Sequence, residues 1–248
     1  MNFVMRKLFG AYVRRVQKTA AAYGGNFTWD FSQCLEPVNS IIGTDKITED
    51  GICEMLSAKW IDEHAHEGSL ANWIVGPDQR VDASKIRLLM QWFMIGDSMK
   101  PQQMVEAGHS RGGADVWSSR GDNQDMATRN FLLSRGVIRR GRVGAGSMAK
   151  GAKSDGAIKF ALPRALIDNR GGTGSYRVIG VWGSIGGHCM ACYTGLQDIA
   201  FFDPNFGEFW FSDKKKFVEW CARGFFPTSF YSYTLNGSYE VFDYALRA

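Results

Sequence analysis

Residues 186–195 read GGHCMACYTG and place His188 directly before a C-x-x-C pair, Cys189 and Cys192. Such a segment could be a metal site, a redox pair, or a strand that carries one catalytic histidine. Zinc needs ligands that converge on one point, whereas strand alternation turns His188 and Cys192 to one face and Cys189 to the other. A thioredoxin-type motif needs a following helix, and this segment is strand-like and bounded by glycines. The catalytic histidine is therefore the favoured interpretation.

Three residues far apart in the chain, Cys53, His188 and Asp203, could together perform acyl transfer. A cysteine attacks a carbonyl as a thiolate, and a helix N-terminus or an adjacent imidazole lowers the pKa of the thiol. Residues 48–63 predict such a helix because their apolar residues recur at helical spacing, which places Cys53 near its start. His188 begins one predicted strand and Asp203 ends the next, so a strand pair can bring the carboxylate against the imidazole and fix its orientation.

The segments around these three residues resemble a known family. GICEMLSAKWI at Cys53, GGHCMA at His188 and FFDPNFGEFWF at Asp203 look like the YopT/AvrPphB family of bacterial effector cysteine proteases, peptidase family C58, which is papain-like. The order and spacing of the three residues agree with that family's cysteine, histidine and aspartate. The resemblance is carried by three segments between residues 51 and 211 and does not extend to the loops between them.

The resemblance implies a cysteine endopeptidase with nucleophile Cys53, general base His188, orienting Asp203, a thioester acyl-enzyme, and no metal or other cofactor. The backbone N–H of Cys53, at a helix start, would bind the oxyanion. Papain-like enzymes often take a second donor from a glutamine six residues before the cysteine, but Ile47 occupies that position here. The nearest upstream amide is Asn39, which becomes the candidate second donor.

The resemblance also implies a bacterial product that acts on a protein substrate in a host or target cell. Relatives cut lipid-anchored small GTPases or host kinases, so the substrate stays open. The start MNFVMRKLFGAYVRRVQK has an apolar stretch broken by basic residues, so we expect secretion without a cleavable Sec signal. Action in the target-cell cytoplasm, including at a membrane, follows from the same resemblance. Asn2 stands where myristoylation would require glycine.

Two other functions fit the same residues. The same triad chemistry serves deamidases, transglutaminases and NlpC-type cell-wall peptidases, so it does not choose the reaction by itself. The F-D-P-N-x-G-x-F run favours the protease. A catalytically silent partner-binding module would instead require Cys53, His188 and Asp203 to be ordinary core or turn residues that coincide in order and spacing.

The elements that would position these residues divide into a helical first half and a β-rich second half. Apolar residues at helical spacing predict helices over 3–20, 48–63, 83–95, 101–107 and 212–225. Short aromatic and β-branched runs predict strands over 158–163, 176–183, 188–195, 199–204 and 208–211. The chain's end predicts a hairpin around Asn236-Gly237. This order predicts an α+β, papain-like fold in which a helical subdomain carrying Cys53 packs on a twisted antiparallel β-sheet.

We expect two parts in the chain. Residues 1–25 predict a basic amphipathic helix, which either packs on the domain or docks to an anionic membrane surface or an acidic partner. Residues 26–248 predict the papain-like catalytic domain. Glycine and basic residues are frequent in 109–156, so we expect a loop-rich insertion there, in which one helix over 123–135 fits the pattern.

The amino-acid composition limits which folds, partners and disulfides are possible. The chain of 248 residues is 45% hydrophobic, enough for a sizeable core. Its net charge of +4 suits an acidic partner but does not demand nucleic acid, which we do not expect as a partner. Five cysteines at irregular spacing are a poor disulfide framework and predict free thiols. Of the remaining histidines, His64 and His66 are expected to be solvated, and His109 opens the loop region without a visible partner.

Overall fold

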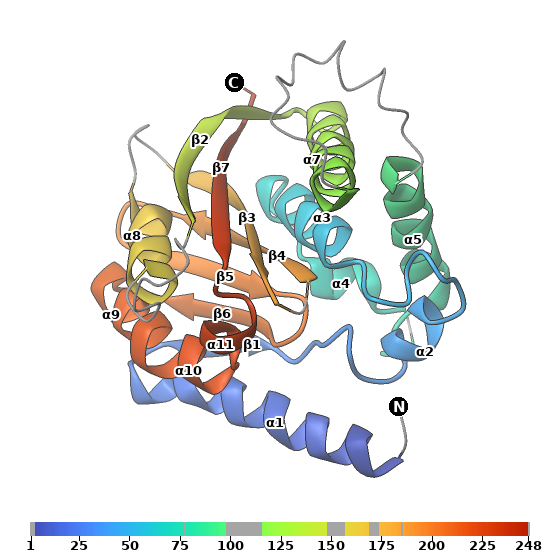
Figure 1. Ribbon diagram of the computed structural model, residues 1–248, viewed down its shortest axis with the longest axis horizontal. Helices are drawn as coiled ribbons and strands as arrows, with labels where there is room; N and C mark the ends of the chain where they lie inside the picture. The colour runs from blue at the N-terminus through green and yellow to red at the C-terminus, as the bar shows by residue number, and fades with distance from the viewer. Residues whose placement is uncertain are drawn as a thin grey trace.

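The fold is built on a seven-stranded antiparallel sheet. The computed structural model describes residues 3–76, 78–97, 116–147, 157–168, 174–184 and 186–247. The strands run in the order β1-β6-β5-β4-β3-β7-β2 across the sheet (Figure 1). Their bounds are β1 Asn26–Trp29, β2 Val137–Ser147, β3 Ser175–Gly183, β4 Gly186–Thr194, β5 Ile199–Asp203, β6 Gly207–Phe211 and β7 Ser238–Leu246.

Helices cover both faces of the sheet, and each face has its own hydrophobic core. One face carries α2 Val38–Ile42, α3 Cys53–Ala65, α4 Leu70–Ile74, α5 Ala83–Asp97 and α7 Val116–Ser134. The other carries α1 Phe3–Ala22, η1 Ala157–Ala161, α8 Leu162–Ile167, α9 Lys214–Trp220, η2 Cys221–Phe225, α10 Phe226–Thr228 and α11 Tyr231–Thr234. The predicted α+β class, with a helical layer that carries Cys53 packed on an antiparallel sheet, is confirmed. Within the described residues, no helix combines the length and apolar character that crossing a bilayer requires.

Strand alternation decides which side chains face which core. On β4, Cys189 and Ala191 belong to the core beneath α3, whereas Met190 and Cys192 belong to the opposite core. The two cysteines of the C-x-x-C pair therefore point to opposite faces, as predicted. All five cysteines of the chain are free thiols.

The core opposite α3 is dominated by aromatic rings. Trp220 lies in contact with rings from β5, β6, α9 and η2, at centroid distances between 4.8 and 5.9 Å. Fully burying one such side chain contributes roughly 1.5–3 kcal/mol. The cluster fixes β5 and β6, and β5 ends at Asp203. Its members include Phe201, Phe206, Phe209, Phe211, Phe217, Trp220 and Phe225.

The N-terminal helix packs on this aromatic face. Val13, Val16 and Ala20 of α1 are buried in its core, whereas Arg14 and Arg15 are exposed. Gln17 Nε2 donates to the Asp30 carboxylate and to a backbone carbonyl at distances of 2.9 and 3.2 Å. In the part of α1 whose side chains the structure describes, the apolar residues Val13, Val16 and Ala20 are therefore already covered by the rest of the chain, and the basic residues Arg14, Arg15 and Lys18 face outward.

Three predictions about local structure are wrong. The strand over 158–163 is instead η1 followed by α8, where Pro163 stands at the helix start and needs no N–H partner. The hairpin around Asn236-Gly237 does not form, because β3 and β2 occupy both edges of β7 and leave none for a preceding strand. The loop expected over 109–156 is replaced, within its described part, by α7 and β2, although α7 confirms the one helix that the pattern over 123–135 indicated. The helix over 101–107 lies outside the described residues.

Candidate active site

Cys53 is the first residue of α3 and is half-buried. The helix begins later than 48–63 predicts, because the Thr48 hydroxyl donates to the Ile42 carbonyl instead of capping α3. Below Cys53, the inward face of α3 packs on β4, and Ser57 Oγ donates to the Cys189 carbonyl over 3.2 Å. This attachment aims the N-terminus of α3 at the strand that carries the histidine.

The sheet register brings His188 and Asp203 to one side of the sheet. Ala191 pairs with Phe202, so one further step along the register sets Met190 opposite Asp203. His188 lies two residues from Met190 and therefore shares its face. The ring atom Nε2 of His188 lies 2.9 Å from Asp203 Oδ1, and both side chains are buried, with residue exposures of 8% and 0%.

The surroundings of His188 favour its charged form. Burial alone lowers the pKa of this imidazole, but the Asp203 carboxylate opposes it through its charge and its hydrogen bond. Cys53 raises the pKa further through a side-chain hydrogen bond and its charge, and the pKa reaches about 10. Because Nε2 is taken by Asp203, Nδ1 is the ring nitrogen left to interact with Cys53. The structure thus brings all three predicted residues together.

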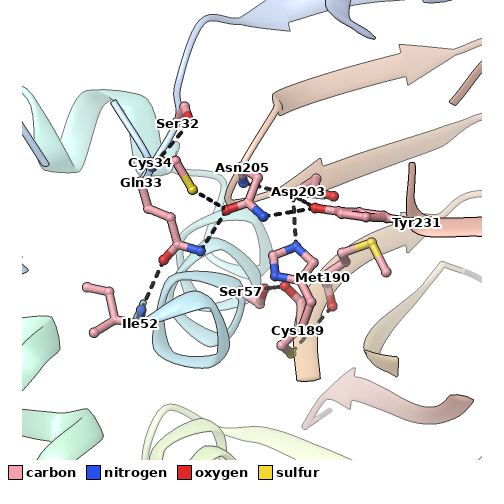
Figure 2. Close-up of polar contacts among 11 residues, drawn as sticks. Ser32, Gln33, Cys34, Ile52, Ser57, Cys189, Met190, Asp203, Asn205 and Tyr231 are labelled. Carbon is pink, nitrogen blue, oxygen red and sulfur yellow. Dashed lines mark hydrogen bonds and ion pairs between the residues drawn. The ribbon is translucent and has the colours of Figure 1, made fainter. Parts of the chain in front are cut away.

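Two further groups hold the Asp203 carboxylate. Oδ1 accepts from the Asn205 backbone N–H at 2.7 Å and from the Tyr231 hydroxyl at 3.4 Å (Figure 2). The Tyr231 ring also lies against the His188 ring, with centroids 5.3 Å apart. The carboxylate and the imidazole are therefore both supported by α11, an element that the sequence analysis placed in a hairpin.

The amide beside the nucleophile turn belongs to Gln33, which the sequence analysis missed. Gln33 Oε1 accepts from the Ile52 N–H, and its Nε2 donates to Asn205 Oδ1, over 3.0 and 2.9 Å (Figure 2). Asn39, the predicted second oxyanion donor, lies half-buried on α2, which packs against α5. Its role stays a prediction. One feature of the sequence could have indicated Gln33: it is a glutamine in an aromatic-rich segment upstream of Cys53.

The two other histidines that the structure describes, His64 and His66, do not join the site. His64, predicted to be solvated, is instead packed among aromatic rings in tilted and edge-on contacts, and its Nδ1 lies 3.1 Å from the Tyr176 hydroxyl. Burial lowers the pKa of His64. His66 is exposed, and His109 lies outside the described residues. Across the described part of the chain, no three His, Cys, Asp or Glu side chains cluster as metal ligands would.

A thiol, an imidazole and a buried carboxylate in this order are the parts of a nucleophilic acyl-transfer site. Comparison with known proteins agrees: the sequence model of peptidase C58, described as Yersinia/Haemophilus virulence surface antigen, matches residues 17–247. The chain belongs to this family of cysteine proteases.

Several cysteine proteases of Yersinia align along most of the chain. The cysteine protease yopT1 of Yersinia enterocolitica serotype O:8 is 30% identical over 239 residues, which are 94% of this chain and 68% of that protein. The cysteine protease YopT of Yersinia pseudotuberculosis is 30% identical over 227 residues, 90% of this chain and 65% of its own length. The chain thus spans about two thirds of these relatives.

A solved structure supports the fold. The Pseudomonas avirulence protein AvrPphB superposes with a TM-score of 0.52 at 12% identity, covering 81% of this chain and 95% of that one. At this identity the likeness concerns the fold and not the substrate. The family assignment and the shared fold agree with the papain-like arrangement of α3 on the sheet.

Proposed function

We propose that the chain is a cysteine endopeptidase of the bacterial effector type, which cleaves a protein of a host or target cell through Cys53, His188 and Asp203. The observation that carries the proposal is the position of His188. Its Nε2 lies 2.9 Å from the buried Asp203 carboxylate, and both Asp203 and Cys53 raise the pKa of its ring.

In this mechanism the thiol proton of Cys53 resides on His188, since Asp203 stabilises the imidazolium. The thiolate attacks the scissile carbonyl, and a C–S bond forms as the carbonyl oxygen becomes an oxyanion. The Cys53 N–H stands at the first residue of α3, where helix N–H groups have no partner inside the helix, and it points to the developing charge. The N–H of Ile52 is already bound by Gln33 and cannot serve.

Collapse of the tetrahedral intermediate breaks the C–N bond. His188 donates its proton to the leaving amine, which leaves a thioester on Cys53. Water, deprotonated by the neutral imidazole, then hydrolyses the thioester and returns the proton to the Cys53–His188 pair. Asp203 keeps its charge throughout and holds one tautomer of the ring.

We also propose that an acidic surface of the target, or an anionic membrane that carries it, is met by the basic residues of α1. Arg14, Arg15 and Lys18 are exposed on the outer side of that helix. If this holds, cleavage of a membrane-bound target falls as salt rises, because exposed charges are screened within about 10 Å at 0.1 M ionic strength. Salt-independent cleavage contradicts it.

The function is tested by mapping new protein termini in host cells that produce the wild-type chain or its Cys53→Ala variant. The wild type should create a small set of new termini that Cys53→Ala does not. Cys221→Ala is the matched control, because Cys221 is a buried thiol in the aromatic core, remote from the triad's hydrogen bonds. Identical termini in wild type and Cys53→Ala refute the proposal, as does activity on peptidoglycan alone.

A further inference from the structure

We propose that Gln33 is a positioning residue of this peptidase, which fixes the start of the nucleophile helix relative to the turn that carries Asp203. The inference rests on the proposed roles of Cys53, His188 and Asp203. It concerns how those residues are held in register, since Cys53 comes from the helical layer and the other two from the sheet.

Gln33 touches both halves of the site at once. It is buried, with 3% exposure, in the segment between β1 and α2. Its Oε1 accepts from the N–H of Ile52, the residue directly before Cys53, and its Nε2 donates to Asn205, two residues after Asp203. Its own backbone N–H donates to the Pro204 carbonyl at 2.7 Å, so the segment is held to the same turn.

The backbone conformation at Gly51, and its lack of a side chain, leave room for the Gln33 amide. Its φ of +122° is one that residues with a Cβ rarely adopt, and a Cβ there would lie 3.1 Å from Gln33 Oε1. The backbone thus passes close to the glutamine and turns so that the next N–H points at it.

Asn205 carries the connection on to the catalytic carboxylate. Its Oδ1 accepts from Gln33 and from the Cys34 thiol at 3.1 Å, and its Nδ2 donates to the Tyr231 hydroxyl at 2.9 Å. Burial raises the pKa of Cys34 to about 12, so this thiol stays protonated and can donate. Figure 2 shows the resulting chain of bonds from Ile52 through Gln33 and Asn205 to Asp203.

This bridge matters because the reaction depends on the distance between Cys53 Sγ and the His188 ring. A misplacement of about 1 Å in an active site can lower a rate by roughly 10²-fold. Without the Gln33 amide, the Ile52 N–H and Asn205 Oδ1 both lose a buried partner, and the start of α3 is released from the turn at 203–205.

Two substitutions separate positioning from simple stability. Gln33→Leu removes both side-chain bonds at similar volume. Gln33→Glu keeps them while its carboxyl is neutral, because a carboxylic acid both accepts and donates, and loses the bond to Asn205 once it ionises. Gln17→Leu is the matched control: Gln17 is also buried, at 5% exposure, and makes two side-chain bonds, but to Asp30 and Phe206.

The measurement is the pH dependence of two rates in the full chain: alkylation of Cys53 by iodoacetamide, located by mass spectrometry, and cleavage of a substrate found by terminus mapping. We expect Gln33→Leu to lower both rates about tenfold or more at every pH, with kcat reduced and KM little changed. Gln33→Glu should approach wild type at acidic pH and fall as its carboxyl ionises. The titratable groups around this position are Tyr12, Cys34, Cys53, His188, Asp203 and Tyr231.

Gln17→Leu should lower the melting temperature without changing either pH profile. The inference is overturned if Gln33→Leu behaves like Gln17→Leu, or if Gln33→Glu shows no recovery at acidic pH. A wild-type chain that is alkylated at Cys53 but cleaves no protein would refute the proposed function alone. The alkylation profiles would then still decide the role of Gln33, because they need no substrate.

Discussion

Among the described residues of the sheet, two buried ion pairs differ in whether their cation can give up its proton. Arg177 on β3 faces Asp243 on β7 as a cross-strand pair and is 1% exposed. Arg140 on β2 binds the same carboxylate, so both oxygens of Asp243 are held by guanidinium groups. At the other pair, Asp203 meets a single histidine, and its Oδ2 has no hydrogen-bond partner among the described residues.

This difference between the cations determines which of the two buried pairs can take part in catalysis. A guanidinium keeps its charge at every accessible pH, so the Arg177–Asp243 pair can only hold strands together. An imidazole can give up its proton, and only one of the two ring nitrogens of His188, Nε2, is bound to Asp203. A buried carboxylate therefore supports the structure in the Arg177–Asp243 pair and proton transfer in the His188–Asp203 pair.

The largest expected effect comes from removing the titratable cation. His188→Ala should lower kcat/KM by roughly 10²–10⁴-fold, the usual range for a general acid–base group. Cleavage of a mapped substrate by purified protein measures this, with circular dichroism to verify folding. Activity within a few fold of wild type would place the base elsewhere.

The next effect comes from neutralising the carboxylate of the same pair. We expect Asp203→Asn to lower kcat/KM by roughly 10²-fold and to move the alkaline limb of its pH profile to lower pH. The sign follows because Asp203 raises the pKa of His188. The stability that this raised pKa provides is complete below about 6.5, the ordinary histidine value, and disappears as the pH rises through about 10.

The variant should therefore lose less stability than wild type between neutral and alkaline pH. Thermal melts across that window check this together with the kinetics. An alkaline limb that stays in place after Asp203→Asn would assign it to another group.

Predictability from sequence differs between the two pairs and the bridge. Cys53, His188 and Asp203 could be named because strand alternation and a helix start constrain their directions. Gln33 could not, because its contact with Ile52 depends on the path of a segment without regular structure. Both edges of β7 are likewise occupied by β2 and β3, which are distant from it in sequence. This explains why the strong Asn-Gly turn signal did not produce a hairpin.

Breaking the structural pair should affect stability and not the reaction. Arg177→Met should lower the free energy of unfolding by about 2 kcal/mol, less than the roughly 3–5 kcal/mol typical of a broken buried pair, since Arg140 still binds Asp243. Urea unfolding measures this. The pH profile of kcat/KM at a temperature where the variant is folded should match wild type, and a shifted profile would link this pair to the active site.

The smallest expected effect concerns a third carboxyl, Glu54, which follows the nucleophile and pairs with a hydroxyl instead of a cation. Its Oε1 accepts from Thr128 Oγ at 2.7 Å. Burial raises the pKa of Glu54 to about 8; the Thr128 bond opposes this, and the charge of Asp125 adds to it. The folded chain thus holds a proton on Glu54 that the unfolded chain releases above the ordinary glutamate pKa. This group therefore makes the free energy of unfolding fall as the pH rises toward 8.

Glu54→Gln removes that dependence and should narrow the difference between melting temperatures at pH 5 and pH 8. Asp213→Asn, at an exposed helix cap, is the control. If the difference between the two melting temperatures stays unchanged, Glu54 is ionised at neutral pH. A negative charge would then lie on the residue next to Cys53 in addition to the charge of Asp203, and the contrast between Asp203, which has a titratable cation, and Glu54, which has none, would be weaker.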